Sequence, residues 1–195
     1  ACLHDHVAIY HHLDTAVRGS QLRASASPSL QRVLHDAVKA RPNVTLDHVG
    51  PLGPGSDVAA LLQHLGIASS DLGFDRAPSD PVYHYHSNYD SFAWMDKFGD
   101  PGFHRHEALA KVLGLTALRA AQQPFLPIDV VAYAHELRTY YDRVRAVADD
   151  RHPHALRALR DAIDGVVQAA ERLGHTQTRL ARRVAALLED AHAPR

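Results

Sequence analysis

The stretch Gln123-Pro124-Phe125-Leu126-Pro127 divides this chain into two parts of different architecture. Two prolines within four residues prevent one helix from running through the stretch, because proline lacks a backbone N–H and clashes with the preceding turn. Upstream, short β-prone runs alternate with helical patterns, whereas only helical patterns follow. We therefore predict an α/β part over residues 1–123 and a helical bundle over residues 124–195.

Upstream of the divide, two runs are strand candidates. Val7-Ala8-Ile9-Tyr10 is β-prone, and we predict a buried strand that presents Asp14 at its carboxyl end. Residues 67–74 form a weaker candidate. Between them, Ser27-Pro28 is typical of a helix start, and apolar residues at helical spacing predict a helix that ends near Arg41-Pro42.

A glycine-rich and proline-rich loop lies ahead of the second strand candidate. Gly50 to Gly55 is a loop by its turn residues, and Ser56-Asp57 is predicted to cap a helix that Gly66 closes. After the strand, a polar loop leads to a short helix predicted over residues 89–98.

Downstream, the helical patterns cover residues 104–121, 128–149, 153–173 and 176–191. The last three belong to the helical part, and their apolar stripes lie opposite charged residues. Such stripes indicate packing inside a small bundle, and they are equally compatible with an interface between two copies.

The composition is that of a folded globular protein. Of 195 residues, 46% are apolar and 22% are charged, and the net charge of -1 provides no overall field for nucleic acid or anionic lipid. No run approaches the roughly 18–20 apolar residues that span a bilayer. The single cysteine, Cys2, cannot form an internal disulfide. Because the chain starts without Met, we expect a piece of a longer protein.

Two places carry groups suited to chemistry. Asp14 follows a strand, where α/β proteins often present catalytic or metal-binding groups, although an aspartate there also caps turns. The loop Tyr83 to Asp90 is dense in imidazole, phenol and carboxylate groups. Zinc accepts such ligands, but a polar surface loop with stacked aromatic residues is an equally good interpretation of the local sequence.

Three longer sequence segments favour a functional role for Asp14 and for the Tyr83 to Asp90 loop. Residues 85–103 read YHSNYDSFAWMDKFGDPGF, residues 53–57 read GPGSD with LGI at 65–67, and residues 126–129 read LPID with Tyr133 and Tyr140 beyond. Together these segments resemble the glutamate carboxypeptidase and transferrin-receptor-like family of di-zinc exopeptidases. Pro54 stands where that family usually has Ser. The resemblance covers most of the chain and weakens after about residue 150.

The resemblance implies a fold, a reaction and a set of site residues. Residues 1–123 would be the C-terminal portion of the zinc-peptidase α/β domain, and residues 124–195 part of a helical dimerisation domain. Asp14 matches the aspartate that binds one zinc ion, and His86 matches the histidine that binds the other. Tyr85 matches a tyrosine that helps to hold the oxyanion, and Gly55 and Ser56 match positions that line the substrate cleft.

The same resemblance implies that part of the site lies elsewhere. The family has a further His, a bridging Asp and a Glu-Glu pair upstream of the first strand, whereas the four glutamates here all follow residue 103 and are never adjacent. We therefore expect this chain alone to lack the general base and to hold no zinc stably. Asp71 and Gly73 stand where glutamate-selective members carry basic residues, so we expect no preference for C-terminal glutamate.

The leading interpretation is thus an incomplete piece of a metallo-exopeptidase that acts on peptides. One alternative is a non-enzymatic relative, similar to the transferrin receptor, and another is a plain helical interaction module. The presence of Asp14, Tyr85 and His86 favours the peptidase, since a receptor has no need of them. The resemblance also implies a homodimer through the C-terminal helices and an extracellular, membrane-anchored or vacuolar setting.

Overall fold

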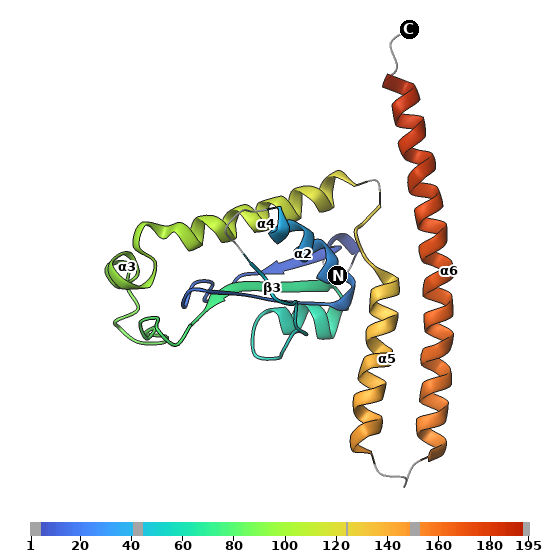
Figure 1. Cartoon of the computed structure of the whole chain (residues 1–195), viewed down its shortest axis with the longest axis horizontal. Coiled ribbons are helices and arrows are strands. Elements are labelled where there is room, and N and C mark those ends of the chain that lie inside the picture. The colour runs from blue at the N-terminus through green and yellow to red at the C-terminus, as the bar shows by residue number, and fades with distance from the viewer. Residues whose placement is uncertain (1–4, 41–44, 124, 149–152, 193–195) are drawn as a thin grey trace. The chain divides into compact units, whose positions relative to one another are not determined.

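The structure is a computed structural model that describes residues 5–40, 45–123, 125–148 and 153–192. The chain forms two compact units, Ala1–Gln122 and Gln123–Arg195 (Figure 1). Within these described residues, the strands lie in the first unit, and the regular elements of the second are helices. The expected mixed α/β class is confirmed. The assignment of these units to a peptidase domain and a dimerisation domain stays a prediction.

Unit 1 is built on a three-stranded sheet with the order β1-β3-β2. The central strand, β3 (Ala68–Asp75), pairs in parallel with β1 (Ile9–His12) and antiparallel with β2 (Gln21–Ala26). The strands predicted over residues 7–10 and 67–74 are present, shifted by two residues and by one residue.

The sequence did not predict β2. Its residues, QLRASA, include no β-branched or aromatic side chain, so local propensity is low. Pairing with β3 along the whole of β2 supplies the hydrogen bonds that make this segment a strand.

Two helices cover one face of the sheet. A 3-10 turn, η1 (Pro28–Leu30), leads directly into α2 (Gln31–Lys39), and α4 (His104–Gln122) lies beside α2 (Figure 1). Pro28 sits in the first turn, where its missing N–H costs nothing. The predicted helix start is confirmed, while its predicted end near Arg41-Pro42 lies outside the described residues.

The core of unit 1 lies between these helices and the sheet. Leu34 of α2 and Val112 of α4 are fully buried, and both pack in one cluster with Leu72 of β3. The other buried members of the cluster are Val17, Ala24, Ala26, Leu30, Ala37, Val38, Phe74 and Leu109. Burial of a large aliphatic side chain contributes about 1.5–3 kcal/mol to the free energy of folding, so this cluster stabilises the sheet. Since the apolar side chains pack on this face, polar side chains can lie on the other.

The opposite side of β3 is covered by a short helical segment over residues 58–65, which includes the π-helical turn η2 (Ala60–His64). Val58 at its start is buried. The helix predicted after Ser56-Asp57 is therefore confirmed.

Three short helical turns connect the sheet to α4. They are α3 (Phe92–Trp94), η3 (Met95–Gly99) and η4 (Pro101–Phe103). The Ser91 hydroxyl caps α3 by accepting a hydrogen bond from the Trp94 N–H at 3.2 Å. The short helix predicted over residues 89–98 thus begins at Phe92.

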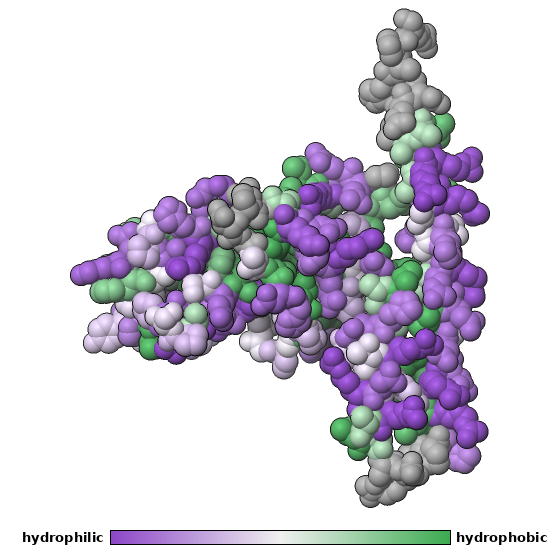
Figure 2. Space-filling view, in the orientation of Figure 1, coloured by the Kyte–Doolittle hydropathy of each residue, from purple (hydrophilic) through white to green (hydrophobic). Residues whose placement is uncertain are grey.

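Unit 2 is a hairpin of two antiparallel helices, α5 (Val130–Val147) and α6 (Pro153–His192). Across the hairpin, His135 Nε2 lies 3.9 Å from Glu171 Oε1 and Arg138 pairs with Asp164, which shows which residues of the two helices face each other. Ala134, Val167 and Ala170 form the buried seam between the helices, and Figure 2 shows apolar side chains where α5 and α6 face each other.

The prediction of separate helices over residues 153–173 and 176–191 was wrong, because α6 is continuous through Gly174. A glycine inside a helix costs about 1 kcal/mol, which does not end a long helix. At this position the missing side chain is also useful, since a Cβ on Gly174 would lie 2.8 Å from Val131 Cγ2 of α5. Within the described residues, every helix is too short or too polar to cross a bilayer.

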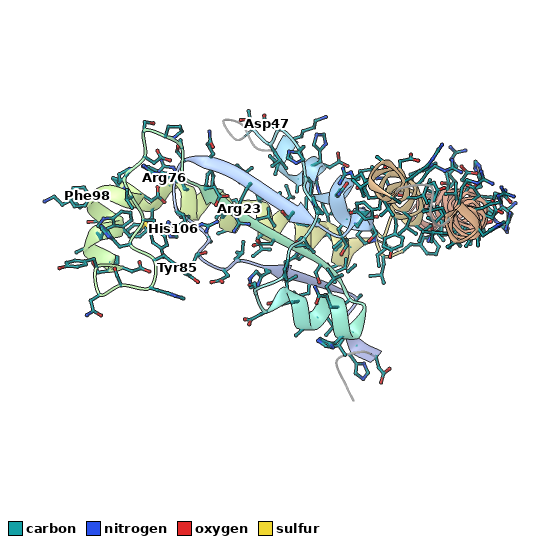
Figure 3. All side chains as sticks on the ribbon, turned by 90° about the horizontal axis from the view of Figure 1, so that it is seen from below. Arg23, Asp47, Arg76, Tyr85, Phe98 and His106 are labelled. Atoms are coloured by element: carbon teal, nitrogen blue, oxygen red, sulfur yellow. The ribbon has the colours of Figure 1, made fainter. Side chains whose placement is uncertain are left out.

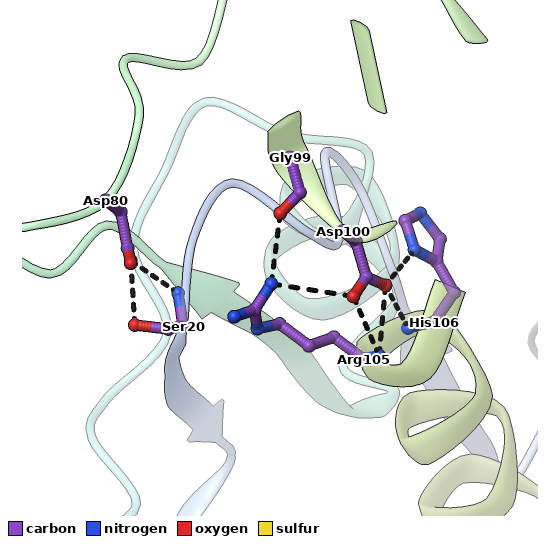
Figure 4. A network of polar contacts seen from close by, with 6 residues as sticks. All are labelled: Ser20, Asp80, Gly99, Asp100, Arg105 and His106. Carbon is purple, nitrogen blue, oxygen red and sulfur yellow. Dashed lines mark hydrogen bonds and ion pairs between the residues drawn. The ribbon is translucent and has the colours of Figure 1, made fainter. Parts of the chain in front are cut away.

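The start of α4 is held by a carboxylate that is almost fully buried. Asp100, 2% exposed, accepts hydrogen bonds from the backbone N–H groups of Arg105 at 3.0 Å and His106 at 3.1 Å (Figure 4). Its Oδ2 also lies 2.8 Å from His106 Nδ1, and its Oδ1 is 3.5 Å from Arg105 Nη1. Asp100 therefore satisfies several donors that the first turn of a helix leaves without partners.

These contacts control the ionisation of Asp100. Burial alone would raise the pKa of its carboxyl, but the hydrogen bonds from the His106 side chain and from the two backbone N–H groups outweigh burial and lower it. Because the folded-state pKa lies below the ordinary value, the contribution to stability is present at neutral pH. It is lost as the pH falls through the folded-state pKa.

We predict that Asp100→Asn lowers the free energy of unfolding at pH 7 by about 1–3 kcal/mol, because it weakens charge-assisted hydrogen bonds to a buried cap. Urea denaturation of both proteins between pH 7 and pH 2 measures the effect. The difference between them should start to shrink once the pH falls below about 4, where the carboxyl of the unfolded wild-type chain takes up a proton, and should be lost below the lowered folded-state pKa. Asp47→Asn, at an exposed position, is the matched control. Equal stability of the two variants at pH 7 would contradict the prediction.

Candidate functional site

The sheet of unit 1 has an apolar face against α2 and α4 and a polar face on the other side. Side chains alternate along a strand, so Tyr10 and His12 of β1 share a face with Asp71 of β3. By the same alternation, Asp75 of β3 and Arg23 of β2 lie on this face. We call these five residues the polar face.

His12 joins the polar face to the loop over residues 50–57. The imidazole is only 6% exposed, and its Nε2 shares a short hydrogen bond with the Ser56 hydroxyl. Its Nδ1 lies 3.2 Å from the Tyr10 hydroxyl. The Ser56 hydroxyl thus contacts β1. The Ser56 carbonyl accepts a hydrogen bond from the Ala59 N–H at 2.9 Å, at the start of the helical segment over residues 58–65. This contact holds the predicted substrate-side residues Gly55 and Ser56 next to β1.

Asp14 lies two residues beyond the end of β1, where it is exposed to solvent. The next residue, Thr15, has a φ of 45°, a left-handed conformation that is uncommon for a residue other than glycine. The chain then pairs with the end of β3, because the Phe74 N–H donates to the Ala16 carbonyl at 2.7 Å. Asp14 therefore sits on a tight, well-anchored turn at the carboxyl end of a strand.

The turn after Asp14 is tied to the loop that carries Tyr85 and His86. Asp80 Oδ2 accepts hydrogen bonds from the backbone N–H of Ser20 at 2.6 Å and from the Ser20 hydroxyl at 2.8 Å (Figure 4). The backbones approach so closely that a Cβ on Gly19 would lie 2.4 Å from Asp75 O and Arg76 Cα. Glycine is thus required at the point where the two segments meet.

Tyr83 is held inside this loop by Asp90. Its hydroxyl donates to Asp90 Oδ2 at 2.7 Å, and burial, followed by that hydrogen bond and the Asp90 charge, raises the pKa of Tyr83 to about 12. The negative charge of Asp14 contributes in the same direction. The ionisation of Tyr83 is thus opposed mainly by burial and by its hydrogen bond to the Asp90 carboxylate.

Tyr85 and His86 form an exposed, stacked pair. Their ring centroids are 3.7 Å apart with the planes inclined at 20°, and the Tyr85 side chain is 53% exposed. His86 has a φ of 56°, which is a second left-handed non-glycine residue in this region. Figure 3 shows Tyr85 at the end of unit 1 that also holds Phe98 and His106. Uncommon backbone conformations concentrate at functional sites, which fits the position of Thr15 and His86 beside the predicted ligands.

The donor atoms of Asp14 and His86 are of the kinds that zinc binds. In the described part of the chain neither side chain makes a hydrogen bond or an ion pair, so both are available. Among residues 5–40, 45–123, 125–148 and 153–192, no group of three His, Cys, Asp or Glu side chains gathers closely enough to hold a metal ion. A catalytic zinc takes three protein ligands, so the described residues fit part of a zinc site.

The charges of the polar face are paired with one another. Arg23 Nη1 lies 2.5 Å from Asp71 Oδ2 and Arg23 Nε lies 3.1 Å from Asp75 Oδ1, while Arg18 Nη2 lies 2.5 Å from Asp75 Oδ1. Two arginines and two aspartates leave no net charge. Asp71 Oδ1 is buried without a hydrogen-bond partner in the described structure. A carboxylate of a bound substrate would place a second negative charge near this oxygen, so this part of the site is less suited to bind one.

Sequence reasoning did not single out His12, Arg23 or Asp80, although each positions part of the site. For His12 a signal was available, because it stands two residues beyond Tyr10, the last residue of the predicted strand, on the way to Asp14. For Arg23 no signal was available, since β2 itself was not predicted. The Ser20–Asp80 contact joins residues 60 positions apart in the chain and depends on the tertiary fold.

We predict that Ser56→Ala lowers the free energy of unfolding by about 1–3 kcal/mol, because it leaves the buried His12 Nε2 without its partner. Amide hydrogen exchange over residues 50–57 should accelerate at the same time. Ser79→Ala, which changes an exposed serine in the same unit, should stay within about 0.5 kcal/mol of wild type. The prediction is wrong if the two variants behave alike in both measurements.

Comparison with known proteins agrees with the resemblance drawn from residues 53–67, 85–103 and 126–140. The chain is 39% identical to a probable glutamate carboxypeptidase of Arthroderma benhamiae, over 68% of this chain and 20% of that protein. It is also 39% identical to a probable glutamate carboxypeptidase of Arabidopsis thaliana, over 66% of this chain and 21% of that protein.

A third relative carries a different activity in its name. The chain is 31% identical to the aminopeptidase NAALADL1 of Mus musculus, over 71% of this chain and 22% of that protein. No protein-family model matches the chain. The chain spans about a fifth of the length of the curated relatives it matches. The expected resemblance is confirmed, and the chain belongs to the peptidase family of the glutamate carboxypeptidases and the NAALADL1 aminopeptidases.

Proposed function

We propose that this chain forms part of a metallo-exopeptidase that hydrolyses peptides with a zinc-activated water. The observation that carries the proposal is the attachment of the Asp14 turn to the Tyr83–Asp90 loop through Ser20 and Asp80. The proposal is supported by two exposed groups of the kinds that zinc binds, a carboxylate and an imidazole, on the two segments that this contact connects, in a chain from a peptidase family.

Asp14 and His86 would each bind one of two zinc ions. Zinc ions in such a site lower the pKa of a bound water and polarise the peptide carbonyl. The tight turns at Thr15 and His86 limit the freedom of the two side chains, which favours a preorganised donor pair.

Tyr85 would donate its phenolic hydrogen to the oxyanion that forms when the carbonyl is attacked. The hydroxyl is a neutral donor, and stacking on His86 restricts the orientation of its ring. Gly55 and Ser56 would line the substrate cleft, in a loop position that His12 fixes.

The proton acceptor for the attacking water would come from outside these residues. The glutamates of the chain are Glu107, Glu136, Glu171 and Glu189, and all four belong to the three long helices rather than to the loops beside Asp14. A general base must lie within hydrogen-bond reach of its proton. The complete reaction is thus assigned to an assembly larger than the 195 residues.

The substrate preference would differ from that of a glutamate-selective enzyme. Arg18 and Arg23 are already neutralised by Asp71 and Asp75, so the polar face offers no uncompensated cation to a carboxylate side chain. We expect peptides with a neutral residue at the recognised position to be better substrates than those with glutamate.

A chimera tests the proposed roles. We would replace the aligned fifth of the Arthroderma benhamiae relative with this chain and measure peptide hydrolysis and bound zinc. Asp14→Ala and His86→Ala should each lower kcat/KM about 100-fold or more with loss of zinc, whereas Tyr85→Phe should lower kcat about 100-fold with zinc retained. Asp47→Asn and His48→Ala, which change exposed residues, should match the unsubstituted chimera. Full activity of the Asp14 and His86 variants would refute their assignment as zinc ligands, whereas an unsubstituted chimera without activity would favour a non-enzymatic relative.

The 195-residue chain alone should hold no stoichiometric zinc and should not cleave peptides, because Asp14 and His86 give each ion one ligand. Dialysis against zinc followed by metal analysis, together with a peptide hydrolysis assay, measures both properties. A purified chain that retains two zinc ions and cleaves peptides would show that the site is complete without further residues.

A further inference from the structure

A serine hydroxyl and a buried imidazole form a pair that the proposed zinc chemistry does not use. Ser56 Oγ and His12 Nε2 share a short hydrogen bond, although the two residues are 44 positions apart in the chain. His12 is 6% exposed, whereas Ser56 is only partly buried, so solvent reaches the serine more readily than the imidazole. A serine becomes a nucleophile when an adjacent base can take its proton.

One tautomer of His12 supplies such a base. His12 Nδ1 lies 3.2 Å from the Tyr10 hydroxyl oxygen, so both ring nitrogens have a hydroxyl partner. A neutral imidazole has one nitrogen that carries a hydrogen and one that accepts. When Nδ1–H donates to Tyr10, Nε2 accepts the hydrogen of Ser56. The pair then has the order of a nucleophile, a base and a group that orients the base.

The glycine loop before Ser56 leaves space for a substrate. Gly55 has a φ of 100°, which glycine adopts without strain. A Cβ placed on Gly53 or on Gly55 would have no atom of a non-adjacent described residue within 4 Å. Gly53, Pro54 and Gly55 are all exposed. An acyl group can therefore approach Ser56 from the side of this loop.

One backbone donor directly follows Ser56. In the described structure the Asp57 N–H donates to no acceptor, and the first bond of the next turn runs from the Ala59 N–H to the Ser56 carbonyl at 2.9 Å. The N–H that follows a nucleophilic serine is a usual donor to the oxyanion that forms on attack. The Asp57 side chain ends in an exposed carboxylate, which favours neutral acyl groups over anionic ones.

We propose that Ser56 is a nucleophile towards neutral carboxylic esters, with His12 as its base. Ser56 Oγ bonds to the ester carbonyl carbon while its proton passes to His12 Nε2. The bond from that carbon to the alcohol oxygen then breaks, and the alcohol leaves with the proton. Water next attacks the acyl group on Ser56 and gives a proton to the same nitrogen, the carboxylic acid departs, and the proton returns to Ser56 Oγ. This reaction goes beyond the proposed zinc chemistry and uses no metal.

Labelling of the full chain with a fluorophosphonate tests the nucleophile. Ser56 Oγ should bond to phosphorus, fluoride should leave, and His12 should take the proton. Peptide mass spectrometry locates the label. Ser79, an exposed serine of the same unit, is the internal reference and should stay unlabelled. A wild-type chain in which Ser56 is unlabelled, or is labelled no faster than Ser79, would overturn the proposal.

A conservative variant tests the base. His12→Gln keeps a polar group that can bind the Ser56 hydroxyl but cannot take its proton. It should lower the rate of Ser56 labelling by about 100-fold or more, with the circular dichroism spectrum of wild type. A folded His12→Gln protein that is labelled at the wild-type rate would refute the role of His12.

Hydrolysis of p-nitrophenyl acetate in EDTA tests turnover. Wild type should form acetyl-Ser56, detected by mass spectrometry, and Ser56→Ala should keep only the background rate of the other imidazole groups. Ser79→Ala should match wild type. Tyr10 is a positioning residue, so Tyr10→Phe should lower kcat by about 10-fold with KM unchanged. Equal rates for wild type and Ser56→Ala would contradict the proposal. Because EDTA removes zinc, a failure here is distinct from a failure of the proposed function.

Discussion

The pairing of β3 on both of its edges is the constraint on which unit 1 depends. One edge of β3 holds β1 in parallel register and the other holds β2 antiparallel, so the turn between β1 and β2 must cross to the far side of the central strand. That turn carries Asp14 and Ser20. Burial of Leu72 and Phe74 against α2 and α4 fixes the register, because a slip of one residue would exchange the apolar and polar faces.

The polar face follows from the same alternation. His12, Arg23 and Asp71 point away from the core, and each finds a partner from a different segment. His12 binds the hydroxyl of Ser56 and so connects the glycine-rich loop to the strand that leads to Asp14. The loop is also joined to the core strand β2, because the Gly50 backbone exchanges hydrogen bonds with Ala24 and Ala26 at 2.9 Å.

The two units differ in how far apart in the chain their contacting residues lie. Unit 1 combines distant segments, and its candidate site exists only where those segments meet. Unit 2 is a local hairpin in which the register of α5 and α6 is set by their seam and by ion pairs such as Arg138–Asp164.

Periodicity and punctuation in the sequence were enough for the mixed class, the start of the helix at Pro28, the strand at residues 68–75 and the family, because these features depend on neighbouring residues. The candidates Gly55, Ser56, Tyr85 and His86 came from the family resemblance, and Asp14 from its position after a strand. Tertiary contacts alone made a strand of residues 21–26, gave the Ser56 hydroxyl to His12 and joined Ser20 to Asp80. Long-range pairing supplies hydrogen bonds and burial that no local window contains, and these free energies outweigh weak local propensity.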